Sequence, residues 1–200
     1  MDLMSKGIPS NFLPPEIEGA AVVADALSRC AQRIGCGDDA FFERLLQGDH
    51  ASHSLLRYEV AKRLADHLGR LGEGLSQVFV YGSTMTDRAV PCSDIDMLVV
   101  LAHKSDQAMT LIGRIDLSLS AGFRLLLPGC RTPDSLLDIH LVDEVEAKTR
   151  RGYGAVLNSV QASPVCLWRT TPRVREGLRP YRSPSDTRLQ KQQADHLFSR

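Results

Sequence analysis

Hydrophobic positions along this chain follow two patterns, and each pattern predicts a different kind of element. Intervals of three and four residues place apolar side chains on one face of a helix, whereas short runs of β-branched and aromatic residues are typical of strands. Helices are expected over residues 15–34, 38–46, 52–71, 105–121 and 144–157, with a short one over 83–88. Strands are expected over residues 76–81, 94–101, 123–127 and 135–143, with an edge strand over 164–169.

The order of these elements predicts an α/β (α+β) fold, in which helices flank a small mixed β-sheet. The chain is expected to have three parts. Residues 1–50 form an N-terminal helical extension, residues 51–171 form the main domain, and residues 172–200 form a basic tail that we expect to be disordered. The helices of the extension are too small to fold alone, so we expect them to pack on the main domain.

Composition and charge exclude several classes of protein. Hydrophobic residues make up 43% and charged residues 24% of the chain, which is typical of a globular protein. No apolar run approaches the ~20 residues of a membrane span, and the N-terminus lacks a signal peptide's pattern, so we expect a cytoplasmic protein without a membrane partner. The formal net charge is zero. Because residues 172–200 are net positive, the remainder is net negative, and nucleic acid is not an expected partner.

Two aspartates stand at the start of the apolar strand expected over residues 94–101. Residues i and i+2 of a strand face the same side, so Asp94 and Asp96 project together. Like charges repel unless a cation lies between them, and hard carboxylate oxygens suit Mg²⁺. Asp138 interrupts a later apolar strand in the same way. The three carboxylates are therefore candidate ligands of a site for two magnesium ions.

A Gly-Ser pair, Gly82 and Ser83, lies where the strand over 76–81 gives way to a short helix. Backbone N–H groups and a hydroxyl at a helix start form a ready phosphate site, and glycine lets the ligand come close to the backbone. A triphosphate held there, with magnesium on the nearby aspartates, is set up for attack at phosphorus. We therefore expect a nucleoside triphosphate as substrate.

The segment GSTMTDRAVPCSDID resembles the signature of the DNA polymerase beta-like nucleotidyltransferase superfamily, and most closely its minimal, stand-alone domains. That signature has Gly-Ser, a spacer of about ten residues and Asp-x-Asp, followed by a third Asp on a later strand, which Asp138 matches. The likeness covers residues 51–169. It implies the nucleotidyltransferase fold for the main domain.

The resemblance also implies an activity. The enzyme would depend on Mg²⁺ and move a nucleoside monophosphate, expected to be AMP from ATP, to a hydroxyl of a protein or small-molecule acceptor, with release of pyrophosphate. Asp94 and Asp96 would hold both metal ions, and Asp138 would bind the catalytic ion and help deprotonate the acceptor. Gly82 and Ser83 would hold the triphosphate.

Two positions depart from the family's pattern. Thr84 stands where the family usually has a small or basic residue, and Asp87 stands where it usually has glycine. An aspartate near a triphosphate is repulsive, whereas Arg88 is expected to replace the missing positive charge. Thr84 and Arg88 therefore complete the candidate nucleotide-binding residues, and the three carboxylates are untouched by these departures.

Three alternatives remain open on the sequence. The chain could be an antitoxin-like binding module that masks a small helical partner protein, because minimal nucleotidyltransferases often occur in such pairs. It could be an aminoglycoside-type small-molecule nucleotidyltransferase, with the N-terminal helices in place of that branch's helical C-terminal domain. It could also keep the fold without catalysis.

Several further residues carry weaker expectations. His140 either contacts the nucleotide or orients a carboxylate, or it is an ordinary strand histidine. Asp143 is expected to cap the closing helix rather than to bind metal. His50 and His53 could share a helical face and bind metal, but no third ligand lies nearby, so we expect a solvated helix start. Tyr153 is expected to pack in the core or at an edge.

Overall fold

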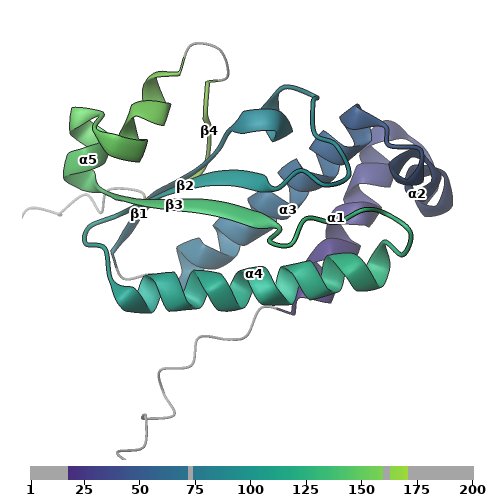
Figure 1. The fold of residues 1–200 in the computed structure, drawn as a ribbon, viewed down its shortest axis with the longest axis horizontal. Helices are drawn as coiled ribbons and strands as arrows, with labels where there is room; N and C mark the ends of the chain where they lie inside the picture. Colours follow the sequence, from purple (N-terminus) through teal and green to yellow (C-terminus); the bar gives the residue numbers. More distant parts are fainter. Residues whose placement is uncertain (1–17, 72–73, 160–162, 171–200) are drawn as a thin grey trace, which may run out of the picture. The chain divides into compact units, whose positions relative to one another are not determined.

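The computed structural model of the chain describes residues 18–71, 74–159 and 163–170 (Figure 1). Its helices are α1 (Gly19–Ile34), α2 (Asp38–Leu46), α3 (His50–Leu71), α4 (Asp106–Leu126) and α5 (Glu144–Thr149). Its strands are β1 (Leu75–Val80), β2 (Ile95–Leu101), β3 (Leu137–Asp143) and β4 (Val165–Arg169). Two 3₁₀ helices, η2 (Gly82–Met85) and η3 (Gly152–Asn158), complete the described elements.

The four strands form one mixed sheet in the order β3-β2-β1-β4. β1 runs antiparallel to both β2 and β4, whereas β2 and β3 are parallel. Parallel neighbours need a crossover connection, which α4 provides between β2 and β3. The expected α/β class, a small mixed sheet flanked by helices, is confirmed.

The side chains of β2 alternate between two hydrophobic clusters, so the sheet has two different faces. Ile95 and Met97 belong to the large core that α1, α3 and α4 cover. Leu98 and Val100 belong to a smaller cluster together with residues of α5 and η3. The long helices and α5 accordingly lie on opposite sides of the sheet (Figure 1).

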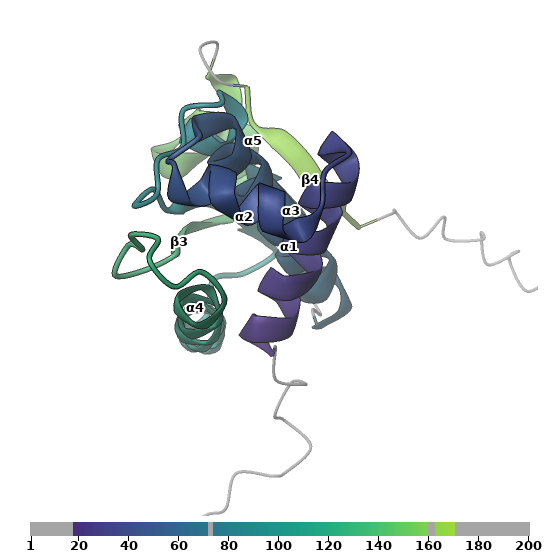
Figure 2. The ribbon, with the colours of Figure 1, turned by 90° about the vertical axis from the view of Figure 1, so that its right-hand side faces the viewer.

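The N-terminal helix α1 is built into the large core. It lies beside α4 (Figure 2), and an added Cβ at Gly19 would lie 2.0 Å from the carbonyl oxygen of Ser118. A Cβ at Gly122 of α4 would lie 2.5 Å from the backbone nitrogen of Ala20. Glycine at both positions permits the close approach of the two backbones. The N-terminal helices therefore pack on the main domain, as expected.

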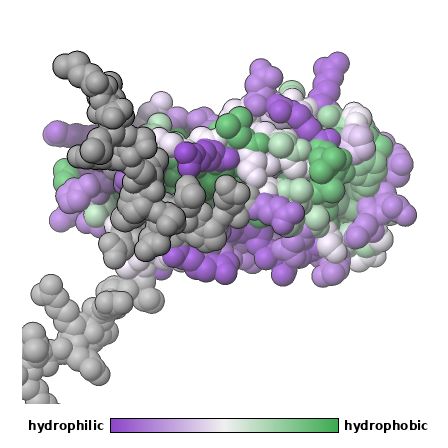
Figure 3. Space-filling model, turned by 90° about the horizontal axis from the view of Figure 1, so that it is seen from below, coloured by the Kyte–Doolittle hydropathy of each residue, from purple (hydrophilic) through white to green (hydrophobic). Residues whose placement is uncertain are grey.

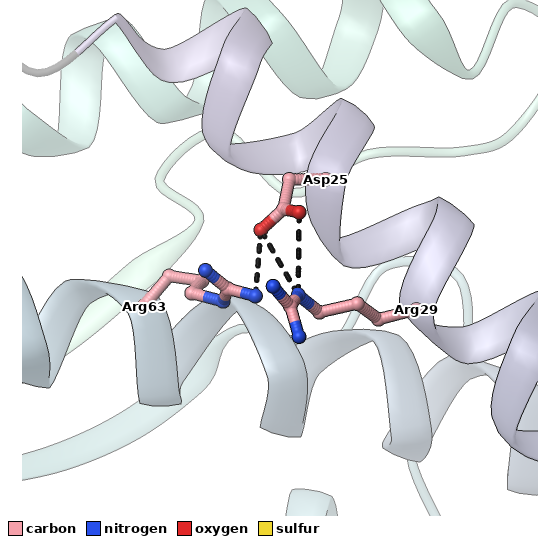
Figure 4. Close-up of polar contacts among 3 residues, drawn as sticks. All are labelled: Asp25, Arg29 and Arg63. Carbon is pink, nitrogen blue, oxygen red and sulfur yellow. Dashed lines mark hydrogen bonds and ion pairs between the residues drawn. The ribbon is translucent and has the colours of Figure 1, made fainter.

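Ion pairs join α1 to α3 on the surface. Asp25 of α1 accepts a hydrogen bond from Nε of Arg29 at 3.2 Å and lies 2.7 Å from an Nη atom of Arg63 on α3 (Figure 4). All three side chains are partly exposed to solvent. The contact therefore combines opposite charges where water also reaches them.

The strand expected over 123–127 is wrong, because α4 continues to Leu126. Ile115, Leu119 and Phe123 are buried at intervals of four residues, which extends the core-facing stripe of the helix through the short apolar run. Gly122 does not end the helix. Its missing side chain instead makes room for α1. The apolar run therefore belongs to a helix face rather than to a strand.

The opposite face of α4 carries hydrophobic side chains that the core does not use. Met109, Leu117 and Leu125 are exposed. Seen from below, the side on which α4 lies, hydrophobic residues are interspersed with hydrophilic ones (Figure 3).

Among the described helices, none combines the length and the hydropathy that a membrane span requires.

The closing helix expected over 144–157 is wrong in its length. α5 ends at Thr149, because Arg150 adopts a left-handed conformation with φ 58°, and the separate 3₁₀ helix η3 follows. Residues 15–17 of the first expected helix and the expected tail, 172–200, lie outside the described residues. The division at 50/51 and at 171/172 stays a prediction.

Candidate active site

Gly82 follows β1 at the point where the chain turns toward β2. It has a φ of 71°, a left-handed conformation that glycine adopts without strain. A Cβ at this position would lie 2.0 Å from Oδ2 of Asp96. The backbone N–H of Tyr81 also donates to the carbonyl of Asp96 at 3.1 Å. The Gly82 backbone therefore lies directly against the Asp96 carboxylate.

Asp96 and Asp138 occupy the same level of the sheet. They are register partners on the parallel strands β2 and β3, so their side chains leave the same face. That face also carries the small cluster under α5, opposite the large core. Asp94 precedes β2 by one residue and stands two positions before Asp96. The structure thus brings all three predicted carboxylates to one edge of the sheet.

The charges of these carboxylates act on one another. Burial, followed by the charges of Asp94 and Asp138, raises the pKa of Asp96 from 3.8 to about 6, although a backbone hydrogen bond from Ser83 opposes the rise. Burial, followed by the charges of Asp96 and Asp138, also raises the pKa of Tyr81. A concentration of negative charge with a perturbed carboxyl is typical of functional sites. Tyr81 is a neighbour of the site that the sequence gave no reason to select.

The three carboxylates interact electrostatically, but their side chains are not arranged as a complete set of metal ligands. Within the three described ranges, no group of three or more His, Cys, Asp or Glu side chains is arranged to hold a metal ion. Repulsion between ionised carboxylates favours separated side chains when no cation lies between them. The donor chemistry, three aspartates at one edge, nevertheless suits a hard divalent cation.

The residues after Ser83 have different environments. Thr84 is buried, and its hydroxyl oxygen has no hydrogen-bond partner among the described residues. Asp87 and Arg88 are exposed. Asp87 has a φ of 52°, and aspartate is one of the few residues that tolerate this left-handed conformation. This backbone explains why glycine suits the position in the family's pattern.

His140 and Tyr153 form a stacked pair beside Asp138. Their ring centroids lie 3.5 Å apart with an interplanar angle of 14°, and Nε2 of His140 lies 3.5 Å from Oδ2 of Asp138. Tyr153 is 54% exposed, so it does not lie in the core, and its packing is the stack on His140. The contact with Asp138 is compatible with the expectation that His140 orients a carboxylate.

Asp143 has the structural role that was expected for it. Its side chain accepts from the backbone N–H of Glu146 at 2.7 Å, and the Glu146 side chain accepts from the backbone N–H of Asp143 at 3.0 Å. This reciprocal pair is a capping box at the start of α5. Of the two aspartates of β3, Asp143 is therefore a helix cap, and Asp138 stays the predicted site residue.

Helix α4 fixes the start of β3. The backbone N–H of Leu137 donates to Asp116 at 2.9 Å, and that of Leu136 donates to the Ser120 hydroxyl at 3.1 Å. Both acceptors lie on α4, so the strand reaches Asp138 from an anchored start. The helix therefore anchors the start of the strand that carries the predicted site residue, in addition to filling the core.

Helix α3 supplies residues that sequence reasoning missed. The Ser54 hydroxyl accepts from the backbone N–H of Ala89 at 3.1 Å, in the loop between β1 and β2. Arg57 and His53 are 0% exposed, so the expected solvated helix start is wrong for His53. Polar residues at this spacing in a helix usually face water, and no local pattern separates these buried ones from exposed ones.

Comparison with known proteins agrees with this geometry. Residues 61–189 match the family model described as the nucleotidyltransferase domain. This segment is more than half of the chain and contains Gly82, Ser83 and the three aspartates, so the chain belongs to the nucleotidyltransferase domain family. No curated protein and no solved structure matches the chain. The expected resemblance is confirmed, and the protein is a nucleotidyltransferase that acts on a nucleotide substrate.

Proposed function

We propose that this enzyme transfers a nucleoside monophosphate, AMP from ATP, to a hydroxyl of a protein or small-molecule acceptor and releases pyrophosphate in an Mg²⁺-dependent reaction. One observation carries the proposal. Asp96 and Asp138 are register partners on parallel strands, and the Gly82 backbone lies against the Asp96 carboxylate. Burial, followed by the charges of Asp94 and Asp138, raises the pKa of Asp96. Family membership supports nucleotidyl transfer in general.

The residues present fit a divalent cation by their chemistry. Asp94, Asp96 and Asp138 offer only carboxylate oxygens, which Mg²⁺ prefers. A bound ion would offset the charges of Asp94 and Asp138, which after burial raise the pKa of Asp96, and would stabilise negative charge on the transferring phosphoryl group. The proposal assigns Asp94 and Asp96 to both ions and Asp138 to the catalytic one.

The side chains and backbone of the site have separate tasks in the reaction. Asp138 is 45% exposed at its side chain, so an acceptor hydroxyl can reach it and transfer its proton to the carboxylate. The acceptor oxygen then forms a bond to the α-phosphorus as the bond from that phosphorus to the bridging oxygen breaks, and pyrophosphate leaves. Backbone N–H groups near Gly82 and Ser83 bind the triphosphate, and the exposed Arg88 adds positive charge.

Label transfer tests the proposal. The protein is incubated with each NTP labelled at the α-phosphate, with Mg²⁺ and a cell lysate, and the products are separated into proteins and small molecules. We expect one labelled product with ATP, and its loss in Asp138→Asn. Asp143→Asn is the matched control, since it changes the other aspartate of β3 and should retain activity. Absence of label with every NTP, or full activity in Asp138→Asn, would contradict the proposal.

A further inference from the structure

Arg57 of α3 is a cation enclosed in the protein without a carboxylate bonded to it. Its side chain is 0% exposed. No ion pair joins it to a carboxylate in the described part of the chain, and its hydrogen bonds go to backbone carbonyls and to one histidine. A buried charge is costly unless it is paired or fully hydrogen-bonded. Arginine at this position therefore requires a reason beyond filling the core.

The guanidinium group holds the loop that leads into β2. Its Nε and one Nη atom donate to the carbonyl of Ser93 at 2.9 Å and 2.8 Å, and the same Nη donates to the carbonyl of Pro91 at 2.8 Å. The Ser93 carbonyl belongs to the peptide group that carries the nitrogen of Asp94. Arg57 thereby fixes the peptide plane from which the first predicted metal ligand projects.

The other Nη atom of Arg57 is held by His53. It lies 3.1 Å from Nδ1 and 3.2 Å from the carbonyl oxygen of His53. Nε2 of His53 lies 3.0 Å from the carbonyl oxygen of Leu45 in α2, so Nε2 carries the proton and Nδ1 accepts from Arg57. Burial, followed by the charge of Arg57, lowers the pKa of His53, which agrees with a neutral ring.

The charge of Arg57 is balanced from the site and from α4. Burial lowers the pKa of Arg57 to about 10, and the negative charge of Asp94 is the largest opposing contribution. The guanidinium carbon also lies 5.8 Å from the centre of the Phe123 ring, within the range of a cation–π contact. Arg57 remains protonated at neutral pH, and Asp94 is the charged group that contributes most to this.

We propose that Arg57, braced by His53 and α2, is a positioning residue that sets Asp94 for metal binding in nucleotidyl transfer. The proposal rests on the proposed function for the role of Asp94, whereas the hold on the loop is independent of it. Arg57 and the helices α1 and α2 lie outside the segment that matches the family model. Helix α2 would thus support the site indirectly, through the contact of its Leu45 carbonyl with His53.

Arg57→Lys tests this role, with Arg63→Lys as the matched control on the same helix. A lysine cannot donate to both carbonyls of the loop in the arginine's planar arrangement. Arg63 instead pairs with Asp25 at the α1–α3 contact (Figure 4). The first readout is amide hydrogen exchange of residues 90–95 in the metal-free protein. We expect exchange there to become about 10-fold faster or more in Arg57→Lys, and to stay within ~2-fold of the parent in Arg63→Lys, because Arg57 bonds to the loop whereas Arg63 pairs with Asp25.

The second readout is the Mg²⁺ dependence of transfer. Loss of a residue that orients a metal ligand typically costs about 10–100-fold in metal affinity or activity. We expect Arg57→Lys to raise the half-saturating Mg²⁺ concentration by at least ~10-fold, with the KM for NTP at saturating Mg²⁺ changed by less than ~3-fold. Unchanged exchange and unchanged Mg²⁺ dependence in a folded Arg57→Lys would overturn the proposal, even if its melting temperature falls.

His53→Leu decides the matter if Arg57→Lys does not fold. It keeps Arg57 on the loop but removes the ring that braces it, so we expect the same two changes at a smaller size, a few-fold each. Parent-like values in both readouts would contradict the proposal. A parent protein that transfers no nucleotide would instead contradict the proposed function, and loop exchange would still show whether Arg57 holds the segment before Asp94.

Discussion

Charged side chains are arranged in opposite ways at the α1–α3 contact and at the site edge of the sheet. At the contact, Asp25 lies between two arginines in partly exposed ion pairs. At the site, Asp94, Asp96 and Asp138 place like charges near one another, and burial with this repulsion raises the pKa of Asp96 to about 6. Exposed opposite charges stabilise a protein slightly, whereas gathered like charges destabilise it until a cation arrives.

This contrast separates residues that maintain the fold from residues to which the proposed function assigns the chemistry. Strand β3 contains one of each, because Asp143 caps α5, whereas the ion pair that Asp138 makes within the described residues is with His140. Local costs that remain uncompensated are expected where function requires them. Substitutions at the site should therefore affect activity more than stability, whereas substitutions at the α1–α3 contact should affect stability more than activity.

The largest effect is expected for Asp96→Asn. Loss of a direct metal ligand should exceed the about 10–100-fold effect of losing a residue that only orients one, so we expect transfer to fall by more than ~100-fold. Asp25→Asn, which removes the carboxylate of the α1–α3 contact, should retain activity within ~2-fold. Near-parental transfer by Asp96→Asn would contradict the assignment of this carboxylate to the site.

The same variant should change how stability depends on pH in the absence of metal. The pKa of Asp96 is about 6 in the folded protein and near 4 when unfolded, so the folded state binds more protons between these values. The free energy of unfolding of the parent should therefore fall as pH rises from about 4 to 6, and this contribution should be constant above. Asp96→Asn should lack that fall, and its free energy of unfolding at pH 7 should be no lower than that of the parent. Urea unfolding at several pH values measures both.

The next effect is expected for glycine-to-alanine changes, made at Gly82 and at Gly113. Gly82→Ala combines a φ of 71° with a Cβ only 2.0 Å from Oδ2 of Asp96. It should cost about 1–2 kcal/mol for the backbone conformation and displace the carboxylate, with a loss of activity. Gly113 in α4 has nothing within 4 Å of an added Cβ, so Gly113→Ala should stabilise the helix by up to ~1 kcal/mol. Equal effects of the two substitutions on activity would contradict the assignment of Gly82 to the site.

A smaller effect is expected for Asp143→Ala. Loss of an N-cap typically costs about 1 kcal/mol, and the capping box of α5 depends on this side chain. Thermal unfolding should show the loss while the transfer rate stays near that of the parent. A rate as low as that of Asp138→Asn would mean that Asp143 also serves the site.

The smallest effect is expected at the α1–α3 contact. Asp25 is 43% exposed at its side chain, and exposed ion pairs typically contribute about 0–1 kcal/mol. Asp25→Asn should lower the free energy of unfolding by less than ~1 kcal/mol, and the difference should shrink further in high salt. A larger, salt-independent loss would show that this contact is more than a surface pair.

The parts of the site that follow from local periodicity could be predicted from the sequence. Asp94 and Asp96 were predicted together because they stand two apart at a strand start, and the charge of Asp94 does act on Asp96. Gly82 stands where the backbone closely approaches a neighbour. Asp143 was predicted as a cap because it precedes an acidic helix start. Each of these features depends on a few neighbouring residues, which the sequence displays directly.

The remaining parts depend on tertiary contacts that local patterns do not contain. The apolar run over 123–127 resembled a strand, and only its alignment with Ile115 and Leu119 in the three-dimensional helix shows otherwise. Burial of His53 and Arg57 depends on α2, α4 and the loop before β2, which are far apart in the sequence. Buried polar residues of this kind can be recognised only once the fold is known.

The central claim, that the three carboxylates form a metal-dependent nucleotide site, is tested most directly by thermal melts with and without Mg-ATP. A ligand that binds only the native state stabilises it by about 2.7 kcal/mol at 100 times its Kd. We predict stabilisation of the parent and of Asp143→Asn, and much weaker stabilisation of Asp96→Asn and Asp138→Asn. Equal stabilisation of all four proteins would contradict the claim, because Mg-ATP would then bind without these carboxylates.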